Sequence, residues 1–243
     1  GETEDSLGAG ARALAVDASG NNWVATNAWG DTSVFKTNQD GSPYQESVVA
    51  EKGALRRFSP DGALLGTVSL LDTPMDLALA EANGTPVVLA PYRNITSYHG
   101  AQVREGVMLV RVSDGRRVGE IKAPTGSVAV DEQGRIWASD VAGHVSCHEL
   151  KGRKLFDVAG TPAAAVPDAK LPAGSPLPAV VRPDGKGTTW VLYTLQRKLA
   201  AVDASGKPQG EPKAAPETAG GLLRLAVTGA GPWVLGEKGG WRP

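Results

Sequence analysis

The side chains best suited to acid–base chemistry in this sequence are its three histidines, His99, His144 and His148. His144 and His148 are four residues apart on one expected strand, so at ~3.3 Å per residue their Cα atoms lie about 13 Å apart. That separation is too large for both rings to bind one zinc ion, whose bonds to histidine nitrogen are about 2.1 Å long. His99 and His144 fall in different loops, where two imidazoles can meet as a general acid and a general base. They are the candidate catalytic residues, and the alternative is that all three histidines are ordinary polar residues of loops and strand edges.

Carboxylate and amide side chains in the expected loops suggest a second chemistry, the binding of a divalent metal. Calcium takes about six to eight oxygen ligands and accepts them from flexible loops. The candidate ligands by position are Asn27, Asp31, Asp140 and Glu237, with Asp72 and Asp76 as weaker substitutes. Such an ion would be structural or catalytic.

Other catalytic and binding motifs are missing from the sequence. It contains no G-x-S-x-G, no Walker or Rossmann glycine motif before a helix and no C-x-x-C-H. Its single cysteine, Cys147, cannot form an internal disulfide and is expected to be a buried strand thiol. A net charge of −1 without a basic block argues against nucleic acid as a partner. No apolar run reaches the ~18 residues that a membrane-spanning helix needs.

The stretch 125–158 indicates what elements would position these side chains. Four short runs rich in β-branched and apolar residues are separated by the turns DEQG, DVAG and LKGR. Turns this short leave no room for a crossover helix, so the four strands must form an antiparallel meander. Asp17, Glu81 and Asp131 precede equivalent turns, and we expect them to bond to the turn backbone as Asx-type residues.

Weaker copies of this unit occur before and after it. The expected second strand of each copy is marked by Asn22–Ala25, Pro86–Leu89, Ile136–Ser139, Thr189–Leu192 and Pro232–Leu235, and all but Pro86–Leu89 contain a tryptophan. The spacing of the markers is close to the ~40–50 residues of one four-stranded propeller blade. We therefore predict an all-β propeller of four-stranded antiparallel blades, with four full blades and a partial fifth of two strands. Residues 1–11 would be an N-terminal tail and 12–243 the propeller domain, either closed irregularly or part of a larger ring.

This pattern resembles the NHL-repeat propellers, with kin in the virginiamycin B lyase and gluconolactonase groups. The resemblance lies in LAVDASGNNWVATN (14–27), VAVDEQGRIWASD (128–140), FSPDG (58–62) and VSDGR (112–116). From the gluconolactonase-like relatives it implies a divalent metal held by carboxylates and amides at the channel mouth, although their inner-strand glutamate has no convincing counterpart here. From the lyase-like relatives it implies that His99 and His144 act as acid and base. Because propellers carry many unrelated activities, function must be argued from the site itself.

Two long insertions identify the face on which we expect a ligand to bind. In a propeller, the connections between the second and third strands of all blades lie on one face. Residues 27–53 and 91–105 are such connections in the first two blades, and long loops of compact domains are commonly functional. The expected contact residues are Trp29, Tyr44, Tyr92, Arg93 and Tyr98. Aromatic side chains among amides and carboxylates suit a sugar or a protein; alternatively, these aromatics only pack the loops onto the blades.

The prediction from sequence is a non-catalytic binding or scaffold module that recognises a protein or a polysaccharide. We expect it in the periplasm or secreted from a bacterium, associated with the rest of a larger protein or complex. The alternative is a metal-assisted lactonase- or lyase-type enzyme with its site at the channel mouth, using His99, His144, Asp140 and Asp31.

Overall fold

The computed structural model describes residues 11–27, 33–38, 40–47, 53–70, 74–96, 102–140, 142–159, 179–216, 224–236 and 238–243. Residues 1–10, which make up most of the expected N-terminal tail, lie outside these ranges. Every helix or strand assigned within them is a β-strand. None of the described residues forms a helix long and apolar enough to cross a membrane.

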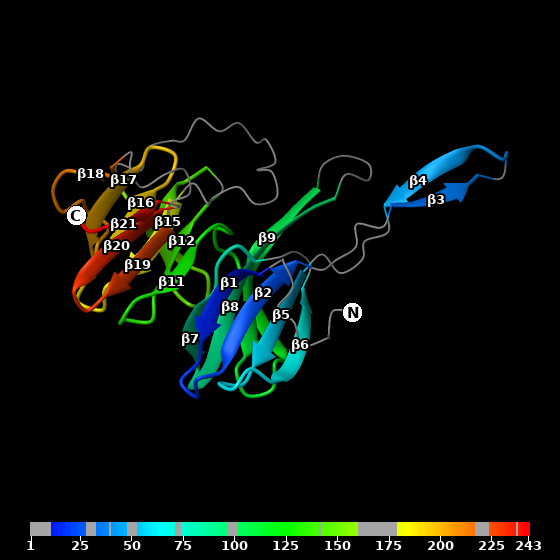
Figure 1. Cartoon of the computed structure of the whole chain (residues 1–243), viewed down its shortest axis with the longest axis horizontal. Helices are drawn as coiled ribbons and strands as arrows, with labels where there is room; N and C mark the ends of the chain where they lie inside the picture. The colour runs from blue at the N-terminus through cyan, green and yellow to red at the C-terminus, as the bar shows by residue number, and fades with distance from the viewer. Residues whose placement is uncertain are drawn as a thin grey trace.

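The described strands form six antiparallel sheets, five of which are arranged as the blades of a propeller (Figure 1). Blade 1 contains β1 (Ala11–Val16), β2 (Asn22–Asn27), β5 (Gly53–Phe58) and β6 (Leu64–Leu70). Blade 2 contains β7 (Ala78–Ala82), β8 (Thr85–Thr96), β9 (Gln102–Arg111) and β10 (Arg117–Ile121). Blade 3 contains β11 (Val128–Val130), β12 (Ile136–Ser139), β13 (Val145–His148) and β14 (Lys154–Asp157).

The last two blades are less regular. Blade 4 contains β15 (Ala179–Pro183), β16 (Thr188–Tyr193), β17 (Lys198–Asp203) and the very short β18 (Lys213–Ala214). Blade 5 contains β19 (Arg224–Thr228), β20 (Gly231–Gly236) and β21 (Gly239–Trp241). The predicted fold of four full blades and a partial fifth is thus confirmed. The fifth blade has three strands rather than the two expected, because the chain turns back after Gly236 and pairs Trp241 with Val234.

Both predicted insertions contain strands. Within 27–53, β3 (Ser33–Thr37) and β4 (Pro43–Ser47) form a separate two-stranded sheet, set apart from the blades in Figure 1. Residues 91–96 and 102–105 form strands, where we expected a loop. The β8–β9 ladder runs without a break from Val87↔Arg111, through Pro91, to Thr96↔Gln102. Pro91 ends the apolar strand in the sequence pattern, yet the backbone ladder continues past it.

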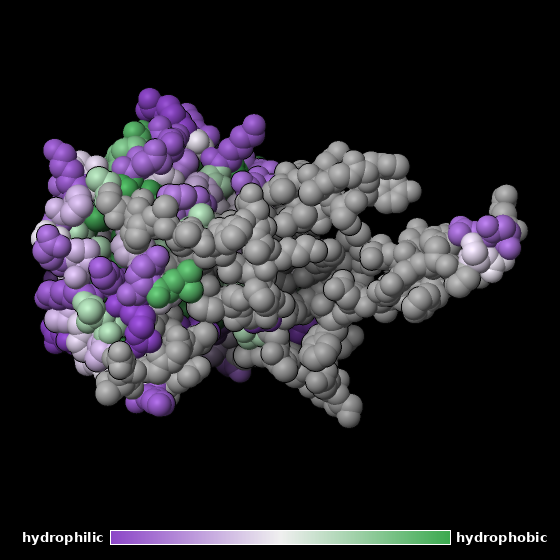
Figure 2. Space-filling view, turned by 90° about the horizontal axis from the view of Figure 1, so that it is seen from above, coloured by the Kyte–Doolittle hydropathy of each residue, from purple (hydrophilic) through white to green (hydrophobic). Residues whose placement is uncertain are grey.

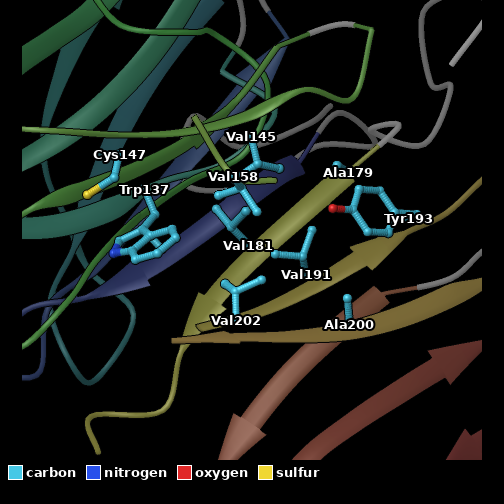
Figure 3. Packing of buried hydrophobic residues seen from close by; sticks show 11 residues of the cluster. Trp137, Val145, Cys147, Val158, Ala179, Val181, Val191, Tyr193, Ala200 and Val202 are labelled. Carbon is cyan, nitrogen blue, oxygen red and sulfur yellow. The ribbon is translucent and has the colours of Figure 1, made fainter. Parts of the chain in front are cut away.

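The hydrophobic core consists of four clusters, each between two successive blades. Alternate residues of a strand point to opposite faces of its sheet, so blades 2, 3 and 4 each pack one face against the blade before and the other against the blade after. Figure 3 shows the cluster between blades 3 and 4, where Trp137 and Cys147 face Val181, Val191 and Val202. The first strands are also in series: β1 contacts β7, β7 contacts β11, β11 contacts β15, and β15 contacts β19.

Candidate functional site

The predicted site residues divide by where they fall in the structure. Trp29, Asp31, Asp72, Tyr98, His99 and Glu237 lie outside the described residues. Asn27, Tyr44 and Arg93 are placed by backbone pairing on β2, β4 and β8. Tyr92, Asp140 and His144 have described side chains, so the structure can be compared with their expected roles.

Tyr92 belongs to the core, and the expectation that it contacts a partner is wrong. Its side chain is 2% exposed and packs in the cluster between blades 1 and 2. The strand alternation explains this, since Tyr92 follows Val88 and Ala90 on the same face of β8. Its hydroxyl donates a hydrogen bond to the Glu120 carboxylate on β10. The aromatic residue therefore fixes the base of the β8–β9 hairpin.

Asp140 and His144 form a carboxylate–imidazole pair between β12 and β13. His144 Nδ1 lies 2.8 Å from Asp140 Oδ2, and both side chains are exposed. A carboxylate at this nitrogen fixes the orientation and tautomer of an imidazole, which is the arrangement that a histidine base requires. The pair lies in a strand-two-to-strand-three connection, the same kind of connection as the two insertions. His99, its expected partner, is outside the described residues.

The same turn geometry recurs where no catalytic pair exists. Asp140 Oδ1 accepts hydrogen bonds from the backbone N–H groups of residues 142 and 144. Asp17, Asp131, Asp184 and Asp203 accept the same two bonds, from the second and fourth residues after them. In blade 3, Arg135 then binds the second oxygen of Asp131, as His144 binds that of Asp140. These are Asx turns, as predicted for Asp17 and Asp131, and the geometry of the Asp140–His144 pair follows from its turn.

The predicted metal site does not form among the described residues. The parts of the chain that the structure describes contain no group of three His, Cys, Asp or Glu side chains placed to hold an ion. Asp140 uses one oxygen for the turn and the other for His144. The metal that the resemblance implies therefore has no fitting ligand set among the described residues, and two of its expected ligands, Asp31 and Glu237, lie outside them.

Sequence reasoning missed a polar cluster where three blades meet, and gave Asp76 the wrong role. Instead of being free to bind a metal, the buried Asp76 carboxylate accepts two hydrogen bonds from Arg182 of β15, both of 2.8 Å. Ser127 Oγ donates a hydrogen bond of 2.5 Å to the Asp76 carboxylate. The backbone N–H of Val128 donates another, of 3.1 Å, to the same carboxylate. Burial alone would lower the pKa of Arg182, but the Asp76 carboxylate outweighs it and the pKa is raised.

A signal for this cluster does exist in the sequence. In each blade, one residue of the first strand pairs with the tryptophan of the second strand, or with Val87 in blade 2. In four blades this residue is an alanine: Ala15, Ala80, Ala129 and Ala226. In blade 4 it is Arg182, paired with Trp190. A single arginine where every other repeat has alanine needs a partner for its charge, and Asp76 supplies it.

No protein-family model and no curated protein sequence matches the chain. Solved structures are similar to it at low identity. Virginiamycin B lyase from Staphylococcus aureus is 14% identical, with 96% of this chain and 78% of that chain covered and a TM-score of 0.45. Kuenenia stuttgartiensis hydrazine synthase is 15% identical, with 96% and 58% covered and a TM-score of 0.55. A protein of unknown function from Bacteroides caccae is 12% identical, with 94% and 71% covered and a TM-score of 0.54.

The two likenesses with TM-scores of 0.55 and 0.54 agree with the sheet arrangement on the fold and extend no further. The protein is a five-bladed β-propeller. The chain spans less than two thirds of the hydrazine synthase chain. At such low identities the likeness carries no activity from those proteins to this one.

Proposed function

We propose that the protein is a non-catalytic binding module that holds a protein or polysaccharide partner on the face formed by the strand-two-to-strand-three connections. The observation that supports this is the length of the β8–β9 hairpin. β8 has 12 residues, whereas the second strands of the other blades have four to six. From Tyr92 to Thr96, β8 pairs with β9 alone. This two-stranded part is called the arm below.

The arm fits a docking role on physical grounds. Tyr92 packs in the core at the base of the arm, and beyond it β8 pairs with β9 and with no other strand. An isolated two-stranded ladder is only marginally stable in water, and a strand edge that pairs with no neighbour offers its backbone groups to other chains. The β3–β4 hairpin is a second two-stranded sheet in the equivalent connection of blade 1. The turns on the opposite face, by contrast, are short and satisfied by their own aspartates. A partner that covers the arm would satisfy its backbone and fix its position.

Shortening the arm tests this function. Residues 94–104 are replaced by Asn-Gly, so that Arg93 and Glu105, which already pair, flank a two-residue hairpin turn. The control variant carries Glu132→Lys and Lys207→Glu in turns of the opposite face. The probes are a microarray of bacterial polysaccharides and cross-linking in cells of the source organism. We expect a ligand bound by the wild type and the control to bind at least about tenfold more weakly to the shortened protein. Equal binding to all three proteins contradicts the proposal.

A lactonase- or lyase-type enzyme is the second candidate, and the Asp140–His144 pair is the observation in its favour. If His144 is a general base, His144→Gln and Asp140→Asn each lower the turnover of a lactone panel by about 100-fold or more. Turnover at the wild-type rate in both variants excludes the pair as a catalytic unit. A calcium ion bound by loop oxygens belongs to this proposal as well, and elemental analysis of the purified protein before and after chelation tests it.

A further inference from the structure

The fourth strand of a blade forms the outer edge of its sheet. β6, β10 and β14 each stand last in the strand order of their sheets, and each pairs with a single described strand. An edge of this kind presents a row of backbone N–H and C=O groups with which another chain can pair. Native proteins therefore interrupt their edges with bulges, charges, prolines or very short strands.

Three of these outer strands carry an extra residue at the same place. The pairing of β6 with β5, of β10 with β9 and of β14 with β13 skips one residue in each case. The skipped residue lies three positions after the glycine of the preceding turn: Leu65 after Gly62, Val118 after Gly115 and Leu155 after Gly152. Such a β-bulge leaves its extra residue unpaired and bends the strand.

The three skipped residues are also aliphatic and partly exposed. The exposed fractions of Leu65, Val118 and Leu155 are 51%, 41% and 37%. Figure 2 shows that hydrophobic residues form only small patches on a largely hydrophilic surface. The position therefore has two features that repeat from blade to blade. An apolar side chain suits contact with a partner, whereas a break in the ladder protects the edge.

Blade 4 separates these two explanations. The residue three positions after its turn glycine, Gly206, is Gln209, which is polar. The break in the ladder is nevertheless retained, since Val202 forms only an isolated bridge to Pro208 and β17 pairs with β18 over two residues. Proline has no N–H to donate and is confined to edges and bulges in sheets. The feature that all four blades share is thus an interrupted edge.

We infer that the bulges at Val118 and Leu155 keep the outer edges of blades 2 and 3 from pairing with other chains. In a regular strand, the backbone groups that point outward recur at every second residue. The extra residue puts the groups before and after it out of step, so an approaching strand cannot form a continuous ladder. In a solution of the pure protein, the chain kept away is a second copy. Removal of the bulge should therefore cause self-association.

Deletion of the extra residue tests this inference. The residues on either side of Val118 already pair with adjacent residues of β9, Val110 and Leu109, so deletion of Val118 restores a continuous ladder. Deletion of Leu155 does the same in β14. Val118→Ser and Leu155→Ser are the matched controls, because they remove the apolar side chain and keep the bulge. In sedimentation equilibrium, we expect each deletion to strengthen self-association at least about tenfold over the wild type, and the controls to match the wild type.

A rescue variant tests whether the restored edge causes the association. Gly119→Lys is added to the deletion of Val118, because a charge on an edge strand opposes pairing. A Cβ on Gly119 meets no atom within 4 Å, so the lysine fits. We expect this variant to return to the wild-type level of association.

Circular dichroism verifies the fold of every variant. Deletion variants that associate no more than the wild type overturn the inference. It is also overturned if both deletions abolish folding, since the extra residue is then required for the fold itself. Weaker self-association of the serine variants than of the wild type overturns it as well, because the aliphatic side chains would then form a contact surface.

Discussion

Asp17 and Asp131 each bind a tryptophan as well as a turn. The second carboxylate oxygen of Asp17 accepts a hydrogen bond from Trp23 Nε1 at 3.0 Å, and that of Asp131 accepts one from Trp137 Nε1 at 2.8 Å. Burial alone would raise the pKa of Asp131, but the bonds from Trp137 and Arg135 outweigh it and the pKa is lowered. One carboxylate thus orders a turn, joins two strands and satisfies a buried indole.

Sequence spacing predicted the turn bonds of these aspartates but not their contacts with tryptophan. Asp184 and Trp190 have the same separation as Asp131 and Trp137, yet the buried Nε1 of Trp190 has no hydrogen-bond partner in the described part of the chain. The blades differ at the residue opposite the tryptophan, which is Ala129 in one and Arg182 in the other. Turn bonds are local and follow from a few adjacent residues, whereas the indole contact depends on packing across the sheet.

His148 makes stability depend on pH. It is buried between blades 2 and 3, where Ser146 Oγ lies 2.8 Å from its Nε2 and its Nδ1 has no described partner. Burial lowers the pKa of His148 from its usual 6.5; the Gly152 backbone and Asp157 oppose this effect, and Lys154 adds to it. The unfolded chain therefore takes up a proton below about pH 6.5 that the folded protein excludes, so stability falls as the pH drops from 6.5 towards the lowered pKa.

We predict that His148→Gln weakens this acid sensitivity while keeping a polar atom near Ser146. The measurement is the urea midpoint of unfolding at pH 7.5 and pH 5.5. His144→Gln is the control, because it removes an exposed imidazole instead of a buried one. If the wild type and His148→Gln lose stability equally between the two pH values, the buried imidazole does not cause the loss.

At the scale of elements, the strands were predictable wherever short turns bound them. The meander of blade 3 matches the prediction strand by strand, because its glycine turns fix the ends. The arm and β21 were missed for different reasons. The arm was missed because β8 continues past Pro91, which the sequence pattern takes as the end of the strand. β21 consists of Gly239, Gly240 and Trp241, and glycine has low strand propensity, so only pairing with β20 defines it.

One turn also acts as a packing element between blades. Gly206 has φ +80°, and a Cβ on it would lie 2.7 Å from two ring carbons of Phe156 on β14. That ring packs edge-on against Trp137 at a centroid distance of 5.5 Å, so it cannot move without disturbing the core. Gly134 has a similar φ of +72° but has no atom within 4 Å of the added Cβ.

We predict that Gly206→Ala is the more destabilising of two matched substitutions. Both introduce left-handed strain of about 1–2 kcal/mol, and Gly206→Ala adds an overpacking cost of about 1–3 kcal/mol. Urea unfolding at neutral pH measures both free energies. Equal losses in the two variants would indicate that the turn of blade 4 does not press on blade 3 in solution.

At the scale of the whole molecule, the cores between blades make each blade depend on its neighbours. The repeat period and the four-strand pattern were sufficient to predict this architecture, because a single four-stranded sheet cannot bury both faces alone. The face with the strand-two-to-strand-three connections can be compared with the sequence prediction only in part, because Trp29, Tyr98 and His99 lie outside the described ranges. The Asp76–Ser127–Arg182 cluster was missed because it joins residues more than 50 positions apart in the chain.

That cluster offers the sharpest test of coupling between blades 2, 3 and 4. Arg182→Met leaves the buried Asp76 carboxylate without its cation. We expect a loss of about 3 kcal/mol, at the lower end for buried pairs because the Arg182 side chain is 31% exposed. Asp76→Leu likewise leaves the arginine unpaired. The double variant removes both charges and should lose less than the sum of the single losses, with a coupling energy of at least about 1 kcal/mol.

Urea unfolding of the four proteins, followed by tryptophan fluorescence and by circular dichroism, completes this cycle. Because the cluster joins the entry of blade 2 to the first strands of blades 3 and 4, the wild type should unfold in one transition by both probes. Breaking the pair should separate the fluorescence and dichroism midpoints if the blades then unfold independently. Additive losses within about 0.5 kcal/mol would mean that the pair is not coupled, and the apolar contacts between the blades would then account for their cooperation.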